Sequence, residues 1–177
     1  RADGSSRFGS ASRWGFFPSA GFSWNITDEE FAKNIPGVSD IKLRLSTGTT
    51  GNQEIADYLS LASLGSTNYN LGGTNLTGFS PTRLSNPDLK WEKTTQSNIG
   101  LDVSLLDKRV NLVFDAYYKK TTDLLVNVPV PLSSGYSSVL QNIGAVENKG
   151  IEFAISTDNV RGDNFTWKSS ANIAFNR

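Results

Sequence analysis

An unbroken alternation of apolar and polar residues between positions 98 and 105 constrains the fold of this chain more than any other feature. The apolar residues are Ile99, Leu101, Val103 and Leu105, and a polar residue or glycine lies before each of them. A period of two residues predicts a β-strand with one apolar and one polar face. The run is long for a strand of a soluble protein, and it fits a strand that crosses a bilayer at a tilt.

The same alternation predicts about seven strands, at residues 1–8, 15–26, 40–50, 91–105, 110–119, 148–157 and 165–175. Charged residues inside these strands fall on the polar face; they are Lys42, Arg44, Asp102, Asp115, Glu152 and Lys168. In a bilayer this segregation would be strict, because a cation on the lipid face at mid-membrane costs about 2–4 kcal/mol. A one-sided sheet in water shows the same alternation more loosely. We therefore expect these six side chains to face the lumen of a barrel.

The connections between the predicted strands alternate in length. Residues 51–90 and 120–147 form long connections, whereas 27–39, 107–109 and 158–164 are shorter. Outer-membrane barrels have this arrangement, with long loops outside the cell and short periplasmic turns. Segments 124–128 and 137–143 either add short strands that extend the barrel or remain loops; the sequence leaves both open.

Aromatic residues occur in two settings. Those near predicted strand ends would form the girdles of a membrane barrel, or ordinary core in a soluble sheet; they are Trp24, Trp91, Tyr118, Phe165 and Trp167. Those in the long connections are candidates for substrate binding together with a neighbouring amide; this set is Tyr58, Tyr69, Asn70, Phe79 and Tyr136. An equally good interpretation is that the loop aromatics only hold the loops together.

Composition excludes several classes of chemistry. The 177 residues include no Cys and no His, which removes disulfides, thiolate metal sites and the commonest general base. The 17 basic residues balance the 17 acidic residues, so no basic excess points to nucleic acid. No 18-residue apolar run predicts a membrane-spanning helix. With no acid–base pair, calcium-loop spacing or phosphate loop, we expect a protein that is not an enzyme and holds neither metal nor cofactor.

Several segments resemble SusC/RagA-type TonB-dependent outer-membrane transporters in the order in which that family has them. They are RADGSSRFG (1–9), RWGFFPSAGFSW (13–24), VSDIKLRLSTGTTGNQ (38–53), NPDLKWEKTTQSNIGLD (86–102), FDAYYKKTTDLL (114–125), NIGAVENKGIEF (142–153) and FTWKSSANIAFN (165–176). The resemblance covers essentially the whole chain. No single segment is diagnostic, and the ordered set carries the assignment.

The resemblance implies a fold, a location and partners. Residues 1–177 would be about seven strands of an all-β, antiparallel, up-and-down transmembrane barrel of about 22 strands with long extracellular loops. Such barrels lie in the outer membrane of Gram-negative, Bacteroidetes-type bacteria and import oligosaccharides, peptides or other nutrients. They work with a SusD-like surface lipoprotein and with the TonB complex. We expect the plug domain, the TonB-contacting N-terminal region and the C-terminal strands to be missing from this chain.

One alternative remains at the level of sequence. A soluble carbohydrate-binding β-sandwich or surface adhesin would bury one face of each sheet and show the same alternation. Strands of a sandwich are broken by turns every 8–12 residues. The predicted strands at 15–26, 91–105 and 165–175 run to or past that spacing, which favours the barrel wall.

Overall fold

Strands dominate the computed structural model, which describes residues 1–33 and 35–177. The chain forms two compact units. The sheet unit comprises Pro18–Thr49, Thr95–Lys120 and Glu147–Arg177, and the loop unit comprises Arg1–Phe17, Thr50–Thr94 and Thr121–Val146. In the described part of the chain the helices are three short 3₁₀ turns: η1 (Ser10–Ser12), η2 (Ile26–Asp28) and η3 (Leu132–Ser134). No helix among these residues is long and apolar enough to span a membrane.

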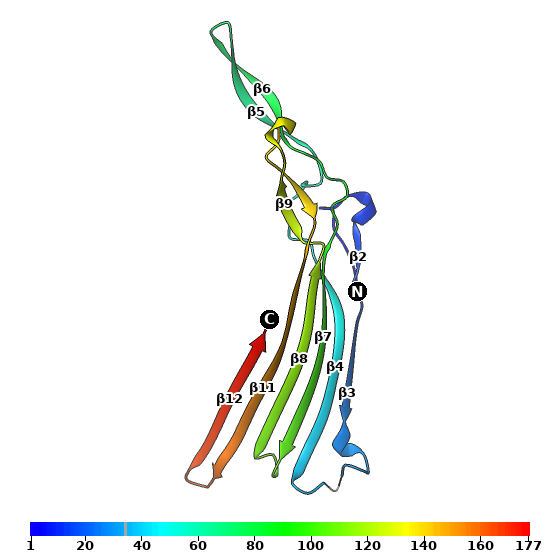
Figure 1. Ribbon diagram of the computed structural model, residues 1–177, viewed down its shortest axis with the longest axis vertical. Helices are drawn as coiled ribbons and strands as arrows, with labels where there is room; N and C mark the ends of the chain where they lie inside the picture. The colour runs from blue at the N-terminus through cyan, green and yellow to red at the C-terminus, as the bar shows by residue number, and fades with distance from the viewer. Residues whose placement is uncertain (34) are drawn as a thin grey trace. The chain divides into compact units, whose positions relative to one another are not determined.

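Six strands form the main sheet. In chain order they are β3 (Ser19–Asn25), β4 (Val38–Asn52), β7 (Glu92–Leu105), β8 (Val110–Thr122), β11 (Ala145–Arg161) and β12 (Thr166–Asn176). Their spatial order is β12-β11-β8-β7-β4-β3, so each strand lies beside the one that precedes it in this series (Figure 1). This antiparallel, up-and-down arrangement confirms the predicted fold class.

The strand register places apolar residues opposite apolar residues. On β3 and β4, Phe22 pairs with Leu45 and Trp24 pairs with Leu43. On β11 and β12, Ile151 pairs with Phe175, and the next pair on that face is Phe153 with Ile173. Because cross-strand partners share a face, these pairs give the sheet one continuous apolar side.

The prediction of seven strands in this sheet is corrected to six among the described residues. The segment at 1–8 contributes only β1 (Ala2–Gly4), which pairs with β2 (Trp14–Phe16) in the loop unit. The predicted strand at 15–26 is divided into β2 and β3 because Phe17 turns into the loop-unit core and Pro18 has no backbone N–H for a ladder bond.

Two further hairpins belong to the loop unit. The first joins β9 (Leu125–Pro129) and β10 (Ser138–Asn142), which resolves the open question about short strands at 124–128 and 137–143. The second joins β5 (Ser63–Leu71) and β6 (Thr74–Arg83) through Gly72 and Gly73. Both glycines have positive φ angles, 59° and 87°, as a two-residue hairpin turn of type I′ requires. The sequence pattern predicts a long connection at 51–90, and the structure corrects residues 63–83 of it to a hairpin.

The loop unit has its own apolar core. Phe8, Phe17, Ile55, Leu89 and Trp91 are buried and pack together. The Trp91 ring lies 5.3 Å from each of the Phe8 and Phe17 ring centroids. The prediction that Trp91 belongs to a membrane girdle is therefore wrong. Only 4% of its surface is exposed, and it precedes the first residue of β7 instead of standing on the outer face of the strand.

Candidate functional site: the polar face of the sheet and the loop core

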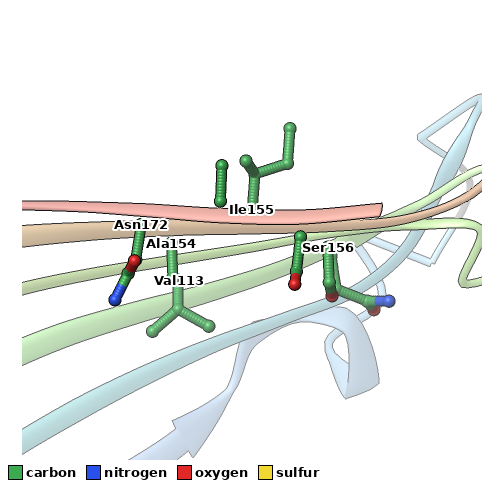
Figure 2. Close-up of a pocket in the computed structure, with 8 residues that line it drawn as sticks. Val113, Ala154, Ile155, Ser156 and Asn172 are labelled. Carbon is green, nitrogen blue, oxygen red and sulfur yellow. The ribbon is translucent and has the colours of Figure 1, made fainter. Parts of the chain in front are cut away.

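The two faces of the main sheet differ in chemistry along each strand. Figure 2 shows Val113, Ala154, Ser156 and Asn172 on one side of the sheet, where they line a hollow, and Ile155 on the opposite side. Residues of β8, β11 and β12 therefore alternate as the sequence pattern predicts. We call the side of Asn172 the polar face and the side of Ile155 the apolar face.

Three of the six predicted polar-face charges form one ion cluster. Arg44 on β4 donates from Nε to Asp102 Oδ2 and from Nη2 to Asp102 Oδ1 on β7, at 2.8 Å each. The same Nη2 donates to Asp115 Oδ1 on β8 at 3.0 Å. A two-point guanidinium–carboxylate pair fixes orientation as well as distance. The cluster connects three neighbouring strands, β4, β7 and β8, on the polar face.

Gly100 on β7 provides the space for this cluster. A Cβ atom at position 100 would lie 2.5 Å from Asp115 Oδ1 and 2.7 Å from Arg44 Cζ. The Arg44 guanidinium thus crosses β7 directly over the Gly100 backbone on its way to β8. A glycine inside a strand costs stability in general, and close approach of another group is a common reason for it. Sequence analysis counted Gly100 only as part of the polar alternation and missed this role.

The remaining polar-face candidates extend the same surface. Glu152 on β11 lines a hollow together with Asp115. Lys42 lies two residues before Arg44 on β4, opposite Asn25 of β3. The structure thus places Arg44, Asp102, Asp115 and Glu152 on adjacent strands. The described residues contain no group of three or more Asp, Glu, His or Cys side chains arranged to hold a metal ion.

Lys168 lies apart from this group, near the connection between β11 and β12. It pairs in register with Asp158, and its Nζ lies 3.3 Å from Asp158 Oδ1. Arg161 Nη2 approaches Asp158 Oδ2 at 2.7 Å. Arg161 Nε also donates to Asp158 Oδ2 at 2.9 Å. This end of the hairpin is therefore an ion-paired surface.

Four of the five predicted girdle residues are exposed on the main sheet or beside it. Trp24 and Tyr118 are 37% and 41% exposed, and Phe165 and Trp167 are 64% and 56% exposed. Trp24 Nε1 donates to Glu29 Oε1 at 3.1 Å. Between them, apolar side chains such as Phe114, Ile151 and Ile173 are also exposed. A sandwich would bury this face under a second sheet, whereas a barrel wall presents it to lipid.

The loop candidates are only partly brought together. Tyr69, Asn70 and Phe79 all lie on the β5–β6 hairpin. Register places Asn70 and Phe79 on one face of the hairpin and Tyr69 on the other. The Tyr69 ring covers Gly78, since a Cβ there would lie 2.9 Å from Tyr69 Cε1. Phe79 is 77% exposed, so it is the most accessible of the three.

The other two loop candidates lie on separate segments. Tyr58 is 71% exposed and has a positive φ of 61°, and its carbonyl accepts a hydrogen bond from Arg83 at the base of the β5–β6 hairpin. Tyr136 is half-buried and follows η3, and its N–H donates to Ser134 Oγ. Tyr58 thus fits in part the interpretation that the loop aromatics only hold the loops together, because its main chain helps to position the hairpin.

Sequence reasoning missed two asparagines that organise the loop unit. Asn142 Nδ2 donates to the carbonyls of Lys90 and Asp123, and its Oδ1 accepts from the Lys90 N–H. Asn86 Nδ2 donates to the Leu140 carbonyl at 2.7 Å. Lys90 Nζ also pairs with Asp123 at 2.9 Å. The segments NPDLKWE and NIGAVEN, which carry the family resemblance, are therefore in contact, and that contact is a physical reason for their residue types.

Comparison with known proteins agrees with this arrangement. The family described as TonB dependent receptor-like, beta-barrel, matches residues 1–177. The chain belongs to this family. TonB-dependent receptors are transporters of the outer membrane and not enzymes. The predicted family is therefore confirmed, and so is the prediction that the protein is not an enzyme.

Among TonB-dependent receptors, receptor P39 of Formosa agariphila is 44% identical over 99% of this chain and 17% of its own length. SusC of Bacteroides thetaiotaomicron is 42% identical over 99% of this chain and 18% of its own length. The structure of the RagAB peptide importer in its closed-closed state has a TM-score of 0.88 and 36% identity, over 99% of this chain and 19% of that one. The chain spans less than a fifth of the relatives that it matches.

Proposed function

We propose that this chain is part of the wall of an outer-membrane importer of the SusC/RagA type. The observation that supports this most directly is the one-sided sheet: apolar side chains stay exposed along one face, while charges are gathered and paired on the other. Water would not favour an exposed apolar face of this length, whereas lipid would.

In this proposal the polar face borders the lumen. Arg44, Asp102, Asp115, Glu152 and Lys42 would face the polypeptide that fills the barrel, and Lys168 would lie near the periplasmic end. The apolar face would contact membrane lipid, with Trp24, Tyr118, Phe165 and Trp167 at the bilayer surfaces.

The loop unit would form the outward-facing side of the protein. The β5–β6 hairpin would present Tyr69, Asn70 and Phe79, and Tyr58 and Tyr136 would complete a substrate-binding or partner-binding surface. We expect oligosaccharides or peptides as substrates, because the family resemblance implies both and one similar structure is that of a peptide importer. A SusD-like surface lipoprotein and the TonB complex would be the partners, and neither nucleic acid nor a cofactor has a role.

The test is purification of the intact protein that contains this chain. The outer-membrane fraction should yield, in detergent, a species several times larger than 19.2 kDa that co-purifies with a lipoprotein. Its deletion from the parent strain should abolish growth on one class of oligosaccharide or peptide while growth on monomers is retained. A soluble species of about the mass of this chain would refute the proposal.

A further inference from the structure

Charged side chains occur at only one end of the apolar face. Within the six strands as the structure describes them, and the residue next to β12, this face carries five charged residues: Lys93, Lys120, Glu147, Lys149 and Arg177. Lys93 belongs to it by the alternation from Ile99 on β7. The alternation from Tyr118 and Ile151 assigns Lys120, Glu147 and Lys149 to it. The backbone N–H groups of Lys149 and Arg177 each donate to the other's carbonyl at 2.9 Å, which continues the register and places both on the same face.

Four of these residues, Lys120, Glu147, Lys149 and Arg177, form a cluster with a net positive charge. Lys120 Nζ lies 2.8 Å from Glu147 Oε1. Lys149 lies two residues from Glu147 on the same face of β11. Three cations and one carboxylate leave a net charge of +2. Glu147 thus orients Lys120 but cannot neutralise Lys149 and Arg177 as well.

The height of this cluster along the sheet matches a bilayer surface. Val160 pairs with Trp167, a predicted girdle residue at the opposite end of the sheet. From Lys149 to Val160 there are 160 − 149 = 11 residues, and a bulge between Asp158 and Val160 takes up one of them. Ten steps of about 3.3 Å, on a strand tilted by about 40°, span about 25 Å, the height of the apolar band of an outer-membrane barrel. Lys149 therefore lies at the level of lipid headgroups.

A shallow hollow lies next to these cations on the same part of the sheet. Apolar atoms of Ala116, Ile151 and Phe175 line it, together with Lys149 and Arg177. An apolar hollow with cations at its membrane-surface end is complementary to an amphiphile, with an acyl chain along the apolar part and an anionic group beside the ammonium groups.

We propose that Lys120, Lys149 and Arg177 form a binding site for a phosphorylated lipid of the surrounding membrane. The phosphate oxygens would accept hydrogen bonds from the two ammonium groups and the guanidinium, which are strong when both partners are charged. This inference rests on the proposed function, because it needs the apolar face to contact lipid.

The test uses the intact protein that contains this chain, purified in detergent and examined by native mass spectrometry. The probe is dioleoyl phosphatidic acid, and dioleoylglycerol is the same molecule without phosphate. We expect selective retention of the phosphorylated lipid. The double variant Lys120→Gln/Lys149→Gln should weaken it about 30-fold, since a lysine near an anionic lipid surface contributes about fivefold. Equal retention of the two lipids, or an unchanged double variant, would overturn the proposal.

Two further variants and one competing ligand distinguish lipid binding from a structural role of the cluster and from binding of free phosphate. Glu147→Gln removes the competing carboxylate and should strengthen retention, whereas a purely structural role would weaken it. Lys119→Gln, the neighbouring position on the polar face, should have no effect.

Displacement of the lipid by inorganic phosphate at equal concentration would assign the site to the free ion and refute the lipid proposal. Absence of the intact protein from the outer membrane would refute the proposed function itself; loss of lipid selectivity in a protein that is present there would refute only this inference.

Discussion

Placing an arginine on either face of β11 tests the assignment of the two faces. Phe153 lies on the apolar face opposite Ile173, and its neighbour Ala154 lies on the polar face beside Val113 and Asn172 (Figure 2). Phe153→Arg and Ala154→Arg introduce the same side chain at adjacent positions. The change in net charge is therefore matched. The two variants differ in the medium that the guanidinium meets and in the side chain removed, since Phe favours strands more than Ala does by up to about 1 kcal/mol.

The expected loss of stability in Phe153→Arg depends on how deep Phe153 lies in the apolar band of the membrane. Phe153 is four residues from Lys149, which is about 13 Å along the strand and about 10 Å of height at a tilt of about 40°. In an apolar band of about 25 Å, Phe153 is within a few Å of the midplane, where arginine on the lipid face costs about 2–4 kcal/mol. The folded-to-unfolded ratio of Phe153→Arg should therefore fall by about 30-fold to 900-fold. Ala154→Arg can extend into the hollow of the polar face and should change it much less.

Assembly in the outer membrane provides the assay. The intact protein with each substitution would be compared by the fraction that resists urea extraction and by the urea midpoint of unfolding in lipid vesicles. Phe153→Arg should lower both measures, and Ala154→Arg should remain close to the parent. If the two variants behave alike, or if Ala154→Arg is the more damaging, the assignment of lipid and lumen faces is wrong.

Three further predictions concern the ion cluster and the loop core. Gly100→Val should lower the free energy of unfolding by about 1–3 kcal/mol, because the new side chain displaces the Arg44 guanidinium from Asp115; a urea midpoint equal to that of the parent would contradict this. Asn142→Ala removes hydrogen bonds to the Lys90 and Asp123 main chains and should lower the stability of the loop core by about 2–3 kcal/mol. The long connections should then be nicked faster by protease on intact cells, and unchanged nicking would show that these bonds are dispensable. Trp91→Ala should destabilise by about 3–5 kcal/mol in the same urea titration as a buried aromatic does, and clearly more than Trp167→Ala at its exposed position; the reverse order would restore Trp91 to a girdle.

The strands of the main sheet were largely predictable, because the apolar and polar residues of each strand alternate between its two faces. A period of two residues is a local property, so the ranges predicted for β4, β7, β8, β11 and β12 agree with the structure to within a few residues at each end. The same logic misplaced Trp91. Its position continues the apolar alternation of β7 in sequence, but the strand begins one residue later, and whether an aromatic enters a core depends on contacts that are distant in the chain.

The β5–β6 hairpin was not predicted, although its sequence contains a turn signature. Gly72-Gly73 lies between the nine residues of β5 and the ten residues of β6 and is a two-residue turn signature. The sequence prediction nevertheless treats 51–90 as one long connection. The contacts of Asn86 and Asn142 are different in kind. Nothing local distinguishes these asparagines from the many others in the long connections, because their partners lie 54 and 52 residues away in sequence.

The β5–β6 hairpin also offers a place to lengthen the chain. Its strands pair with each other from Ser63 with Arg83 up to Leu71 with Thr74, and its turn consists of two glycines next to which a Cβ would meet no other atom. Exposed tips of this kind accept inserted segments more readily than paired backbone does. An epitope or a fluorophore-binding peptide introduced between Gly72 and Gly73 would therefore report on this hairpin in living cells while the wall and the loop core keep their own contacts.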